Sequence, residues 1–416
     1  MHNPALIITV GTGRNRIDIA GAILKSIKHY QPQLIYFIVS EVSLQETMPI
    51  IFPEIAGIPH QLHTLKNYDY DDLQVVYHEC LGVIEALKSK NYQVIVDFTS
   101  GTKAMSAGLA VAAVSNEVEH LNYIIGERDS GGRVLPDTEK ILEVNLNLPV
   151  ADRYIDMAKA YFDQKQFLAS EQACINAQER AWNKQSDQYQ KAELISLVSK
   201  AYFAWDQFHL IKAIELLMGV IGRCDVLPIL LPSTFQEQIR KNAVFLKREV
   251  CYNYSHQKVA DLLENARRRQ YEGKYEDAVA RGYRLIEYLA QMTLWQKYGI
   301  DTNDVDVLKL PSKVSSKYRW KNGVEQGKKI RLPLYQAYDL LFELDDQFGA
   351  LFIEAADSST LLAMRNHSIL AHGFEPVSEN NCEGFLQYAY KLAEIILPEI
   401  ESLCQEARFP EFIALR

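Results

Sequence analysis

The chain has 416 residues, of which 48% are hydrophobic and 23% are charged. This is the composition of a soluble globular protein, and it excludes a disordered, collagen-like or low-complexity chain. The net charge is −9, whereas proteins that coat nucleic acids usually carry a positive charge. A nucleic-acid substrate would therefore have to be held by a local site.

Nothing in the sequence indicates a membrane or secreted protein. The longest apolar runs, such as Leu34–Val39 and Ala107–Val114, are far shorter than the ~20 residues of a membrane helix. Met1–Val10 has no basic region ahead of its apolar run, so we expect a first strand and not a signal peptide. The six cysteines lie far apart without a C-x-x-C pair, which disfavours disulfides and zinc ribbons. We expect a cytoplasmic protein that binds no metal.

Residues 1–148 alternate strand and helix patterns, which predicts an α/β domain with a mostly parallel sheet covered on both faces. The expected strands are 6–10, 34–40, 94–98 and 121–125, with a short edge hairpin over 133–147. The expected helices are 17–30, a long one that follows the N-cap candidates Asp71 and Asp72, and 104–114.

From about residue 149 the strand signal ends and helical periodicity continues, so we expect an all-α region. We divide it into a helical connector over 149–256 and a C-terminal domain over 257–416, which a polar loop at 301–332 interrupts. In the connector, Ala160-Tyr161-Phe162 recurs 41 residues later as Ala201-Tyr202-Phe203. Residues 271–279 resemble the turn of a similar hairpin. The pattern indicates either stacked helical repeats or a coincidence among aromatic-rich helices.

Two loops of small residues follow separate strands of the α/β domain. One is Gly11-Thr12-Gly13, and the other is Thr99-Ser100-Gly101-Thr102-Lys103. Ligands of an open parallel sheet bind beyond the carboxyl ends of the strands, where helix N-termini offer free N–H groups. Hydroxyls, a lysine and a glycine that admits close approach suit a phosphate or a ribose. A plain strand-to-helix turn remains the alternative for each loop.

Two common nucleotide motifs are absent from these loops. Arg16 stands where a dinucleotide fingerprint has its third glycine, which disfavours nicotinamide binding. No G-x-x-x-x-G-K-[ST] loop is present either, which disfavours an ATPase. His60-x-x-His63 lacks a third ligand in view, so we do not expect a metal there.

A second cluster of chemically active residues lies at 364–373. Arg365 and His372 are seven residues apart, so a helix would place both on one stripe, about 10.5 Å apart along its axis. His367 would face away. Gly373 predicts that the helix ends after His372, where the helix dipole favours a protonated imidazole. A histidine that moves a proton and an arginine that holds phosphate oxygens suit phosphodiester chemistry. The alternative is a surface arginine and a capping histidine.

Several of these motifs resemble a known family. Arg365-Asn366 with Ile369–Gly373 resembles the R-x(4–6)-H signature of HEPN ribonucleases, and 265–287 resembles the HEPN helix of CRISPR-associated members. Asp97–Lys103 resembles the T-[SG]-G-T-K motif of the CRISPR-associated Rossmann fold, CARF. In this order, the two resemble the CARF–HEPN ancillary ribonucleases of type III CRISPR systems. The segment 149–256 carries no matching motif.

The resemblance implies a Rossmann-like CARF sensor over 1–148 and a HEPN ribonuclease domain over 257–416. It implies a homodimer whose CARF domains together bind a cyclic oligoadenylate, tetra- or hexa-adenylate, as the allosteric activator. The residues implied in ligand binding are Gly11, Thr12, Gly13, Thr99, Ser100, Gly101, Thr102 and Lys103. No cofactor and no stable complex with the CRISPR effector are implied.

The resemblance also implies the chemistry. The two HEPN domains would combine Arg365, Asn366 and His372 of both copies into one site that cleaves single-stranded RNA without a metal. The products would carry a 2′,3′-cyclic phosphate and a 5′-hydroxyl. Two other functions stay open: a ligand-sensing scaffold or regulator without nuclease activity, and a ring nuclease that cleaves cyclic oligoadenylate in the N-terminal pocket.

Overall fold

A computed structural model gives the structure of the chain. It describes residues 3–13, 16–118, 120–127, 135, 138–144, 146–181, 183–227, 230–312, 314–316, 329–354, 368–370 and 373–412. The chain divides into two compact units. The first comprises residues 1–153 and 179–183, and the second comprises 154–178 and 184–416. The first unit is α/β and the second is helical, which confirms the predicted fold class.

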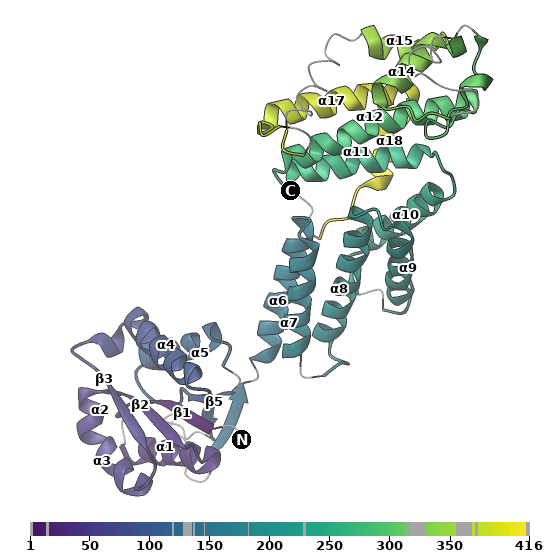
Figure 1. The fold of residues 1–416 in the computed structure, drawn as a ribbon. Coiled ribbons are helices and arrows are strands. Elements are labelled where there is room, and N and C mark those ends of the chain that lie inside the picture. The colour runs from purple at the N-terminus through teal and green to yellow at the C-terminus, as the bar shows by residue number, and fades with distance from the viewer. Residues whose placement is uncertain are drawn as a thin grey trace. The chain divides into compact units, whose positions relative to one another are not determined.

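The first unit is built on a six-stranded sheet with the strand order β3-β2-β1-β4-β5-β6 (Figure 1). Five strands are parallel and the edge strand β6 is antiparallel to β5. Their bounds are β1 (Asn3–Val10), β2 (Leu34–Ser40), β3 (His60–Leu65), β4 (Tyr92–Asp97), β5 (His120–Ile125) and β6 (Lys140–Val144). The direction of winding reverses between β1 and β4, so the carboxyl ends of these two strands form the topological switch point of the sheet.

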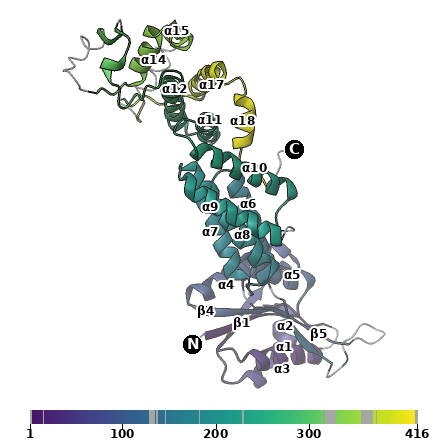
Figure 2. The ribbon, with the colours of Figure 1, turned by 90° about the vertical axis from the view of Figure 1, so that its right-hand side faces the viewer.

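Helices cover both faces of this sheet, as the sequence predicts (Figure 2). One face carries α1 (Arg16–Tyr30), α2 (Glu41–Glu46) and α3 (Met48–Ile51), and the other carries α4 (Leu73–Ser89) and α5 (Lys103–Ser115). Leu6 and Ile8 of β1 pack in the first core, and Ala5 and Ile7 pack in the second. A strand buried on both faces is apolar along its whole length, which is why β1 is easily recognised in the sequence.

Three details differ from the sequence expectations or refine them. Strand β3 was not predicted, because its sequence His60-Gln61-Leu62-His63-Thr64-Leu65 is polar and mostly exposed at the sheet edge. The expected hairpin within 133–147 supplies only β6, whose antiparallel partner is β5. Asp72 is the N-cap of α4, since its side chain accepts a hydrogen bond from the Gln74 N–H at 2.8 Å, and this confirms one of the two cap candidates.

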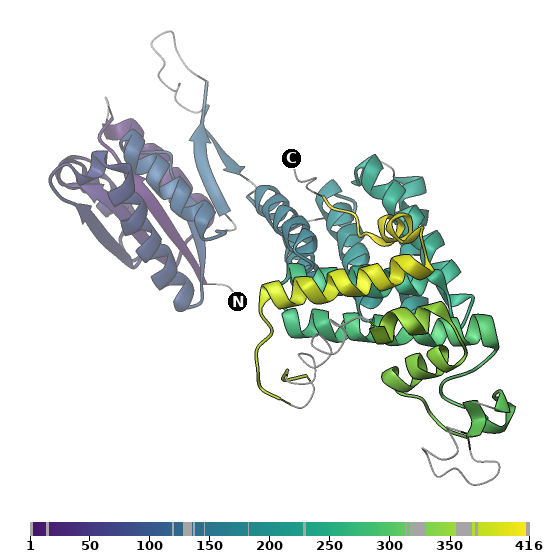
Figure 3. The same ribbon diagram turned by 90° about the horizontal axis from the view of Figure 1, so that it is seen from above.

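The second unit is helical wherever the structure describes regular elements, apart from one isolated bridge between Val305 and Ile330. It contains most of α6 (Asn147–Asp163) and of α7 (Phe167–Arg180), from which residues 147–153 and 179–180 belong to the first unit. Its other helices are α8 (Asp187–Asp206), α9 (Leu210–Val226), α10 (Ser233–Val250), α11 (His256–Tyr271), α12 (Tyr275–Tyr298), η4 (Val307–Lys309), α14 (Leu334–Glu343), α15 (Gln347–Glu354), α17 (Glu379–Ile396) and α18 (Ile400–Ala407). Helices α11, α12 and α17 lie alongside one another (Figure 3). In the described part of the chain, no helix is long and apolar enough to cross a membrane.

The helical hairpins of this unit share one type of turn. A residue with left-handed backbone angles ends a helix at Lys165, Phe208, Gly273 and Asp345. In each case the next N–H donates to the carbonyl five residues back, at 2.8–3.0 Å. The helices therefore end in the same kind of turn, and the expectation of stacked repeats stays a prediction. The first two turns are 43 residues apart and not 41, so Phe162 corresponds to the buried Trp205 and not to Phe203, which is 36% exposed.

The chain after α18 closes an aromatic core between the connector helices. The ring of Phe409 lies 4.6 Å from that of Tyr202 and 4.8 Å from that of Trp205, measured between ring centres. Phe412 stacks on Phe235 with the ring centres 4.2 Å apart. The segments 149–256 and 257–416 thus share one hydrophobic core. The boundary that we expect near residue 257 stays a prediction.

Candidate functional site

The two small-residue loops meet at the switch point of the sheet. A Cβ atom added to Gly11 would lie 2.8 Å from the nitrogen of Gly101, so the two backbones are in contact. The Gly11 N–H donates to Ser100 Oγ at 2.8 Å, and Thr9 Oγ1 donates to the Ser100 carbonyl. Segments that lie about 90 residues apart in the sequence are therefore joined into one double loop.

Asp97 at the end of β4 holds the beginning of the second loop. Its carboxylate is wholly buried and accepts hydrogen bonds from Ser26 Oγ, Thr99 Oγ1 and the Thr99 N–H. Burial raises the pKa of Asp97, and the hydrogen bonds from Ser26 and Thr99 oppose that rise. Thr99 Oγ1 also accepts from the N–H of Ile124 on β5 at 2.9 Å. Our sequence reasoning did not assign Asp97 to the site, although its position directly before the loop was a visible signal.

Thr102 and Gly101 shape the start of α5. Thr102 is the N-cap, where its Oγ1 accepts from the Met105 N–H at 3.2 Å and donates to the Tyr70 carbonyl at 2.5 Å. Gly101 has a φ of +106°, and an added Cβ would lie 2.9 Å from Cβ of Met105, so only glycine fits without strain. The hydroxyls of Thr99, Ser100 and Thr102, which we expected to face a ligand, thus hold the loop in shape.

Thr12 and Lys103 remain as polar side chains at this end of the sheet. Neither side chain has a hydrogen-bond or ion-pair partner among the residues that the structure describes, and Lys103 is exposed as the first residue of α5. The positive end of a helix dipole and an unpaired ammonium both favour an anion. The double loop can therefore bind a phosphate group through Lys103 and free backbone N–H groups.

The three residues that we expect to perform chemistry, Arg365, Asn366 and His372, lie outside the described residues. The chain that follows them is tied to the first turn of α12, where the Val377 N–H donates to Glu276 Oε1 at 3.0 Å. Phe374 in this stretch is 89% exposed.

The part of the chain that the structure describes contains no group of three or more His, Cys, Asp or Glu side chains arranged to hold a metal ion. The two histidines of the H-x-x-H pattern have separate partners. His60 Nδ1 lies 3.0 Å from the Ile58 carbonyl, and His63 Nε2 lies 3.0 Å from Glu79 Oε2.

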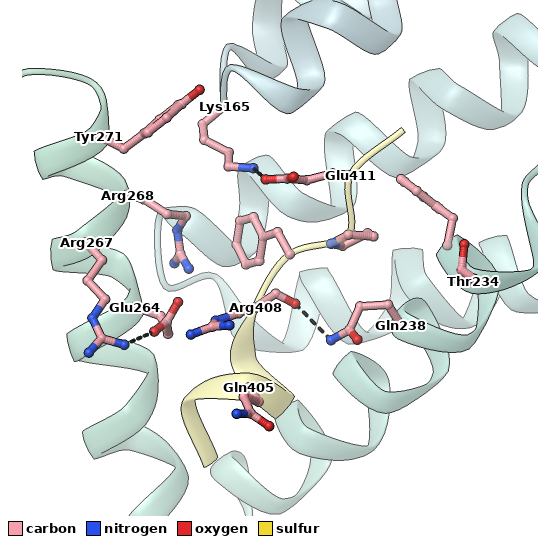
Figure 4. A pocket seen from close by; sticks show the side chains of 13 residues that line it. Lys165, Thr234, Gln238, Glu264, Arg267, Arg268, Tyr271, Gln405, Arg408 and Glu411 are labelled. Atoms are coloured by element: carbon pink, nitrogen blue, oxygen red, sulfur yellow. Dashed lines mark hydrogen bonds and ion pairs between the residues drawn. The ribbon is translucent and has the colours of Figure 1, made fainter. Parts of the chain in front are cut away.

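A cavity of about 730 Å³ lies between α11 and the C-terminal tail (Figure 4). Basic side chains line it, but acidic neighbours neutralise them. Lys165 Nζ lies 3.3 Å from Glu411 Oε1, and Arg267 Nη1 lies 2.6 Å from Glu264 Oε1. Arg268 is buried and pairs with Asp206 at 2.9 Å. The pair of Lys165 with Glu411 joins the tail to a helix, and the three pairs together leave little unbalanced charge for a ligand.

Comparison with known proteins now adds to this geometry. Residues 247–396 match the family described as the Csm6 HEPN domain. The solved structure of Enterococcus italicus Csm6 bound to cyclic hexa-2′-fluoro-hexa-dAMP is 14% identical, covers 97% of this chain and 98% of that chain, and gives a TM-score of 0.63. The chain therefore has the fold of that Csm6 structure, and its matched segment resembles the Csm6 HEPN domain. Arg365, Asn366 and His372 fall within the matched range.

One more solved structure matches part of the chain. Can2 from Sulfobacillus thermosulfidooxidans in complex with cyclic tetra-adenylate is 13% identical, covers 50% of this chain and 68% of that chain, and gives a TM-score of 0.24. No curated protein matches the chain.

Proposed function

We propose that this protein is a single-stranded RNA endoribonuclease that a cyclic oligoadenylate activates, and that it acts in type III CRISPR antiviral defence. One observation carries the proposal: a Csm6-type HEPN domain follows an α/β unit whose two switch-point loops are in backbone contact. This combination supports a sensor and a ribonuclease domain on one chain.

The double loop is the proposed sensor. Lys103 and Thr12 would contact the phosphates and ribose hydroxyls of the ring, and Gly11 and Gly13 would let the ring approach the backbone. Ser100–Thr102 would act through their backbone N–H groups, because the Ser100 and Thr102 side chains hold the loop. Thr99 would act by shaping the loop, since both its N–H and its hydroxyl donate to Asp97. A ring of repeated nucleotides has rotational symmetry, so a two-fold homodimer would offer it equivalent contacts from both copies.

The proposed chemistry needs only groups of the chain and of the RNA. His372 accepts the proton of the substrate 2′-hydroxyl, whose oxygen attacks the adjacent phosphorus. The bond from phosphorus to the 5′-oxygen breaks, and that oxygen takes up a proton. Arg365 binds the phosphate oxygens as negative charge builds up, and Asn366 supplies a hydrogen bond beside it. The products are a 2′,3′-cyclic phosphate and a 5′-hydroxyl.

Location and partners follow from the same proposal. We place the protein in the cytoplasm, where the activator and the target RNA would meet it. It would act as a free homodimer that receives its signal through a diffusible ligand, so a stable complex with the CRISPR effector is not needed.

The test is cleavage of a fluorescent single-stranded RNA with cyclic tetra-adenylate and cyclic hexa-adenylate in parallel. Arg365→Ala and His372→Ala should each abolish cleavage while ligand binding and the oligomeric state stay unchanged. His367→Ala is the matched control, because we assign no chemistry to it. The helix that we expect up to His372 is not found at residues 368–370, which form a bend and a turn. Cleavage should also persist in EDTA. A parent protein that is inactive with both rings, or active variants of both Arg365 and His372, would refute the proposed function.

A further inference from the structure

A groove rich in aromatic residues runs along α12 in the second unit. A hollow of about 590 Å³ lies beside the loop 251–255, and a second hollow of about 380 Å³ lies between α11 and α12. Both are lined by Lys258, Arg284 and Tyr288, so they are parts of one continuous depression. We call this depression the aromatic groove. It extends from Ala280 to Trp295, about 22 Å at the usual rise per residue.

Two aromatic side chains of the groove are exposed, whereas that of Tyr288 is buried. Tyr252 is 69% exposed and Trp295 is 43% exposed. The Tyr254 ring lies between two others, with its centre 5.6 Å from that of Tyr288 and 6.0 Å from that of Trp295. A cluster of exposed rings on a monomer surface marks an interaction site more often than scattered single residues do. Planar rings that water can reach are suitable stacking partners for unpaired bases.

The groove offers one cation without an ion-pair partner in the described part of the chain, Lys258, although the whole chain carries −9. The Lys258 side chain forms no hydrogen bond or ion pair with any residue in the described part of the chain. The Arg284 guanidinium lies 5.8 Å from the Tyr288 ring centre, and Glu287 and Gln291 hold it there. Asp301 is the carboxylate in the lining. Arg284 shares its charge with Glu287 at 3.1 Å, so Lys258 is the cation that is left to meet a phosphate group.

From these contacts we infer that the aromatic groove binds single-stranded RNA. Bases stack on Tyr252 and Trp295, and a phosphate group faces Lys258. These contacts do not select a particular RNA sequence, because every base has a flat face that can stack on an aromatic ring. The groove is longer than one nucleotide needs, which favours a strand over a free nucleotide. The inference rests on the proposed ribonuclease function and extends it by naming a surface that holds the substrate.

The groove contains none of the residues to which we assign the chemistry. The first turn of α12, at Glu276, binds the chain that leaves the catalytic segment, and the groove begins farther along the same helix. A strand held in the groove would therefore extend beyond the cleaved bond. The groove should lower the KM for long RNA and leave kcat unchanged, and it should not affect RNA that is too short to reach it.

The experiment compares the full-length parent with Tyr252→Ala/Trp295→Ala. The binding probe is a mixed-sequence, 2′-O-methylated single-stranded RNA of about 20 nucleotides, which cannot be cleaved. The double variant should bind this RNA about tenfold or more weakly, given the usual contribution of base stacking. Its KM for cleavable RNA of that length should rise by a similar factor, while cleavage of a tetranucleotide stays unchanged. Tyr335→Ala, at an exposed tyrosine of α14, is the matched control and should bind like the parent.

Each other outcome identifies which statement fails. A parent that neither binds nor cleaves RNA refutes the proposed function. If the parent cleaves RNA and the double variant has an unchanged KM, only the inference that the groove binds RNA is overturned. The surface would then be assigned to a protein partner. If the double variant loses AMP binding and RNA binding to the same extent, the groove is a mononucleotide pocket. The inference that it holds an RNA strand is then overturned. If the double variant unfolds, Tyr252→Ala alone, at an exposed loop residue, must still weaken RNA binding, or the inference falls.

Discussion

Gly11 and Gly101 lie backbone against backbone where β1 and β4 end. The contact is so close that a methyl group on Gly11 would lie 2.8 Å from the Gly101 nitrogen and 2.9 Å from its Cα. Backbone atoms cannot move aside as the end of a long side chain can. The proposed ligand loops therefore form one rigid surface, and its shape depends on the absence of a side chain at Gly11.

Gly11→Ala should push the two loops apart. We expect the activator concentration for half-maximal RNA cleavage to rise about tenfold or more, because misplaced N–H groups lose hydrogen bonds to a charged ligand. The rate without activator should not fall. Gly21→Ala is the control, since an added Cβ there meets nothing within 4 Å. If Gly11→Ala needs the same activator concentration for half-maximal cleavage as Gly21→Ala, the loops do not form the sensor.

Lys103 and Thr102 are neighbours with different expected roles, and substitution should separate them. Lys103→Ala removes an exposed cation without a partner, so it should weaken activation and leave the free energy of unfolding nearly unchanged. Thr102→Ala removes the N-cap of α5 and should lower that free energy by about 1 kcal/mol. Thermal unfolding and an activator titration measure the two effects.

Thr102→Ser is the matched control, because serine keeps the capping hydroxyl and should restore stability. Full stability in Thr102→Ala would contradict the capping role. An unchanged activator response in Lys103→Ala would remove the proposed contact between this lysine and a ligand phosphate.

The stability of the second unit should depend on pH through Glu249 on α10. Its carboxyl is buried beside the carboxyl of Asp261. Burial, together with the neighbouring Asp261 charge, raises the pKa of Glu249 from 4.5 to about 9. The folded state therefore keeps a proton that the unfolded state releases. The contribution of Glu249 to the free energy of unfolding should be greatest below pH ~4.5, and it should fall as the pH rises toward 9.

Glu249→Gln keeps the neutral form at every pH, so its stability should decline less than that of the parent between pH 5.5 and 8.5. Some decline should remain, because burial also raises the pKa of Asp261. Unfolding in urea at several pH values measures the slope. Glu237→Gln on the same helix, with a side chain 66% exposed, should follow the parent. Parallel curves for Glu249→Gln and the parent would show that Glu249 is ionised in the folded protein.

Elements buried on both sides were predictable from the sequence, and elements at an edge were not. Strands β1, β2, β4 and β5 have apolar runs, and the switch-point loops follow directly from their order. The polar edge strand His60–Leu65 gives no such signal. Nor can a sequence show how a hydroxyl is oriented. The hydroxyl of Thr99 looked available to a ligand, yet Asp97 and Ile124 bind it.

The aromatic groove shows a second limit of sequence reasoning. Tyr252 and Trp295 are far apart in the sequence, and each alone looks like an ordinary core residue. Only the packing of the loop 251–255 against α12 brings them to one exposed surface. The same holds for the C-terminal tail, because no pattern in 408–412 predicts that it reaches the connector helices.

The last prediction concerns that tail. Phe409 is 8% exposed, and the centre of its ring lies 4.8 Å from the centre of the Trp205 ring. The Arg268 guanidinium carbon lies 3.9 Å from the centre of the Phe409 ring. Phe409→Ala should lower the free energy of unfolding of the second unit by about 3–5 kcal/mol, because the missing ring would leave a cavity at the centre of an aromatic core. Unfolding in urea, followed by tryptophan fluorescence, measures this change.

Phe374→Ala, at a residue that is 89% exposed, is the control and should change the free energy of unfolding by less than about 0.5 kcal/mol. A loss below about 1 kcal/mol for Phe409→Ala would mean that the tail packs on a core that is complete without it.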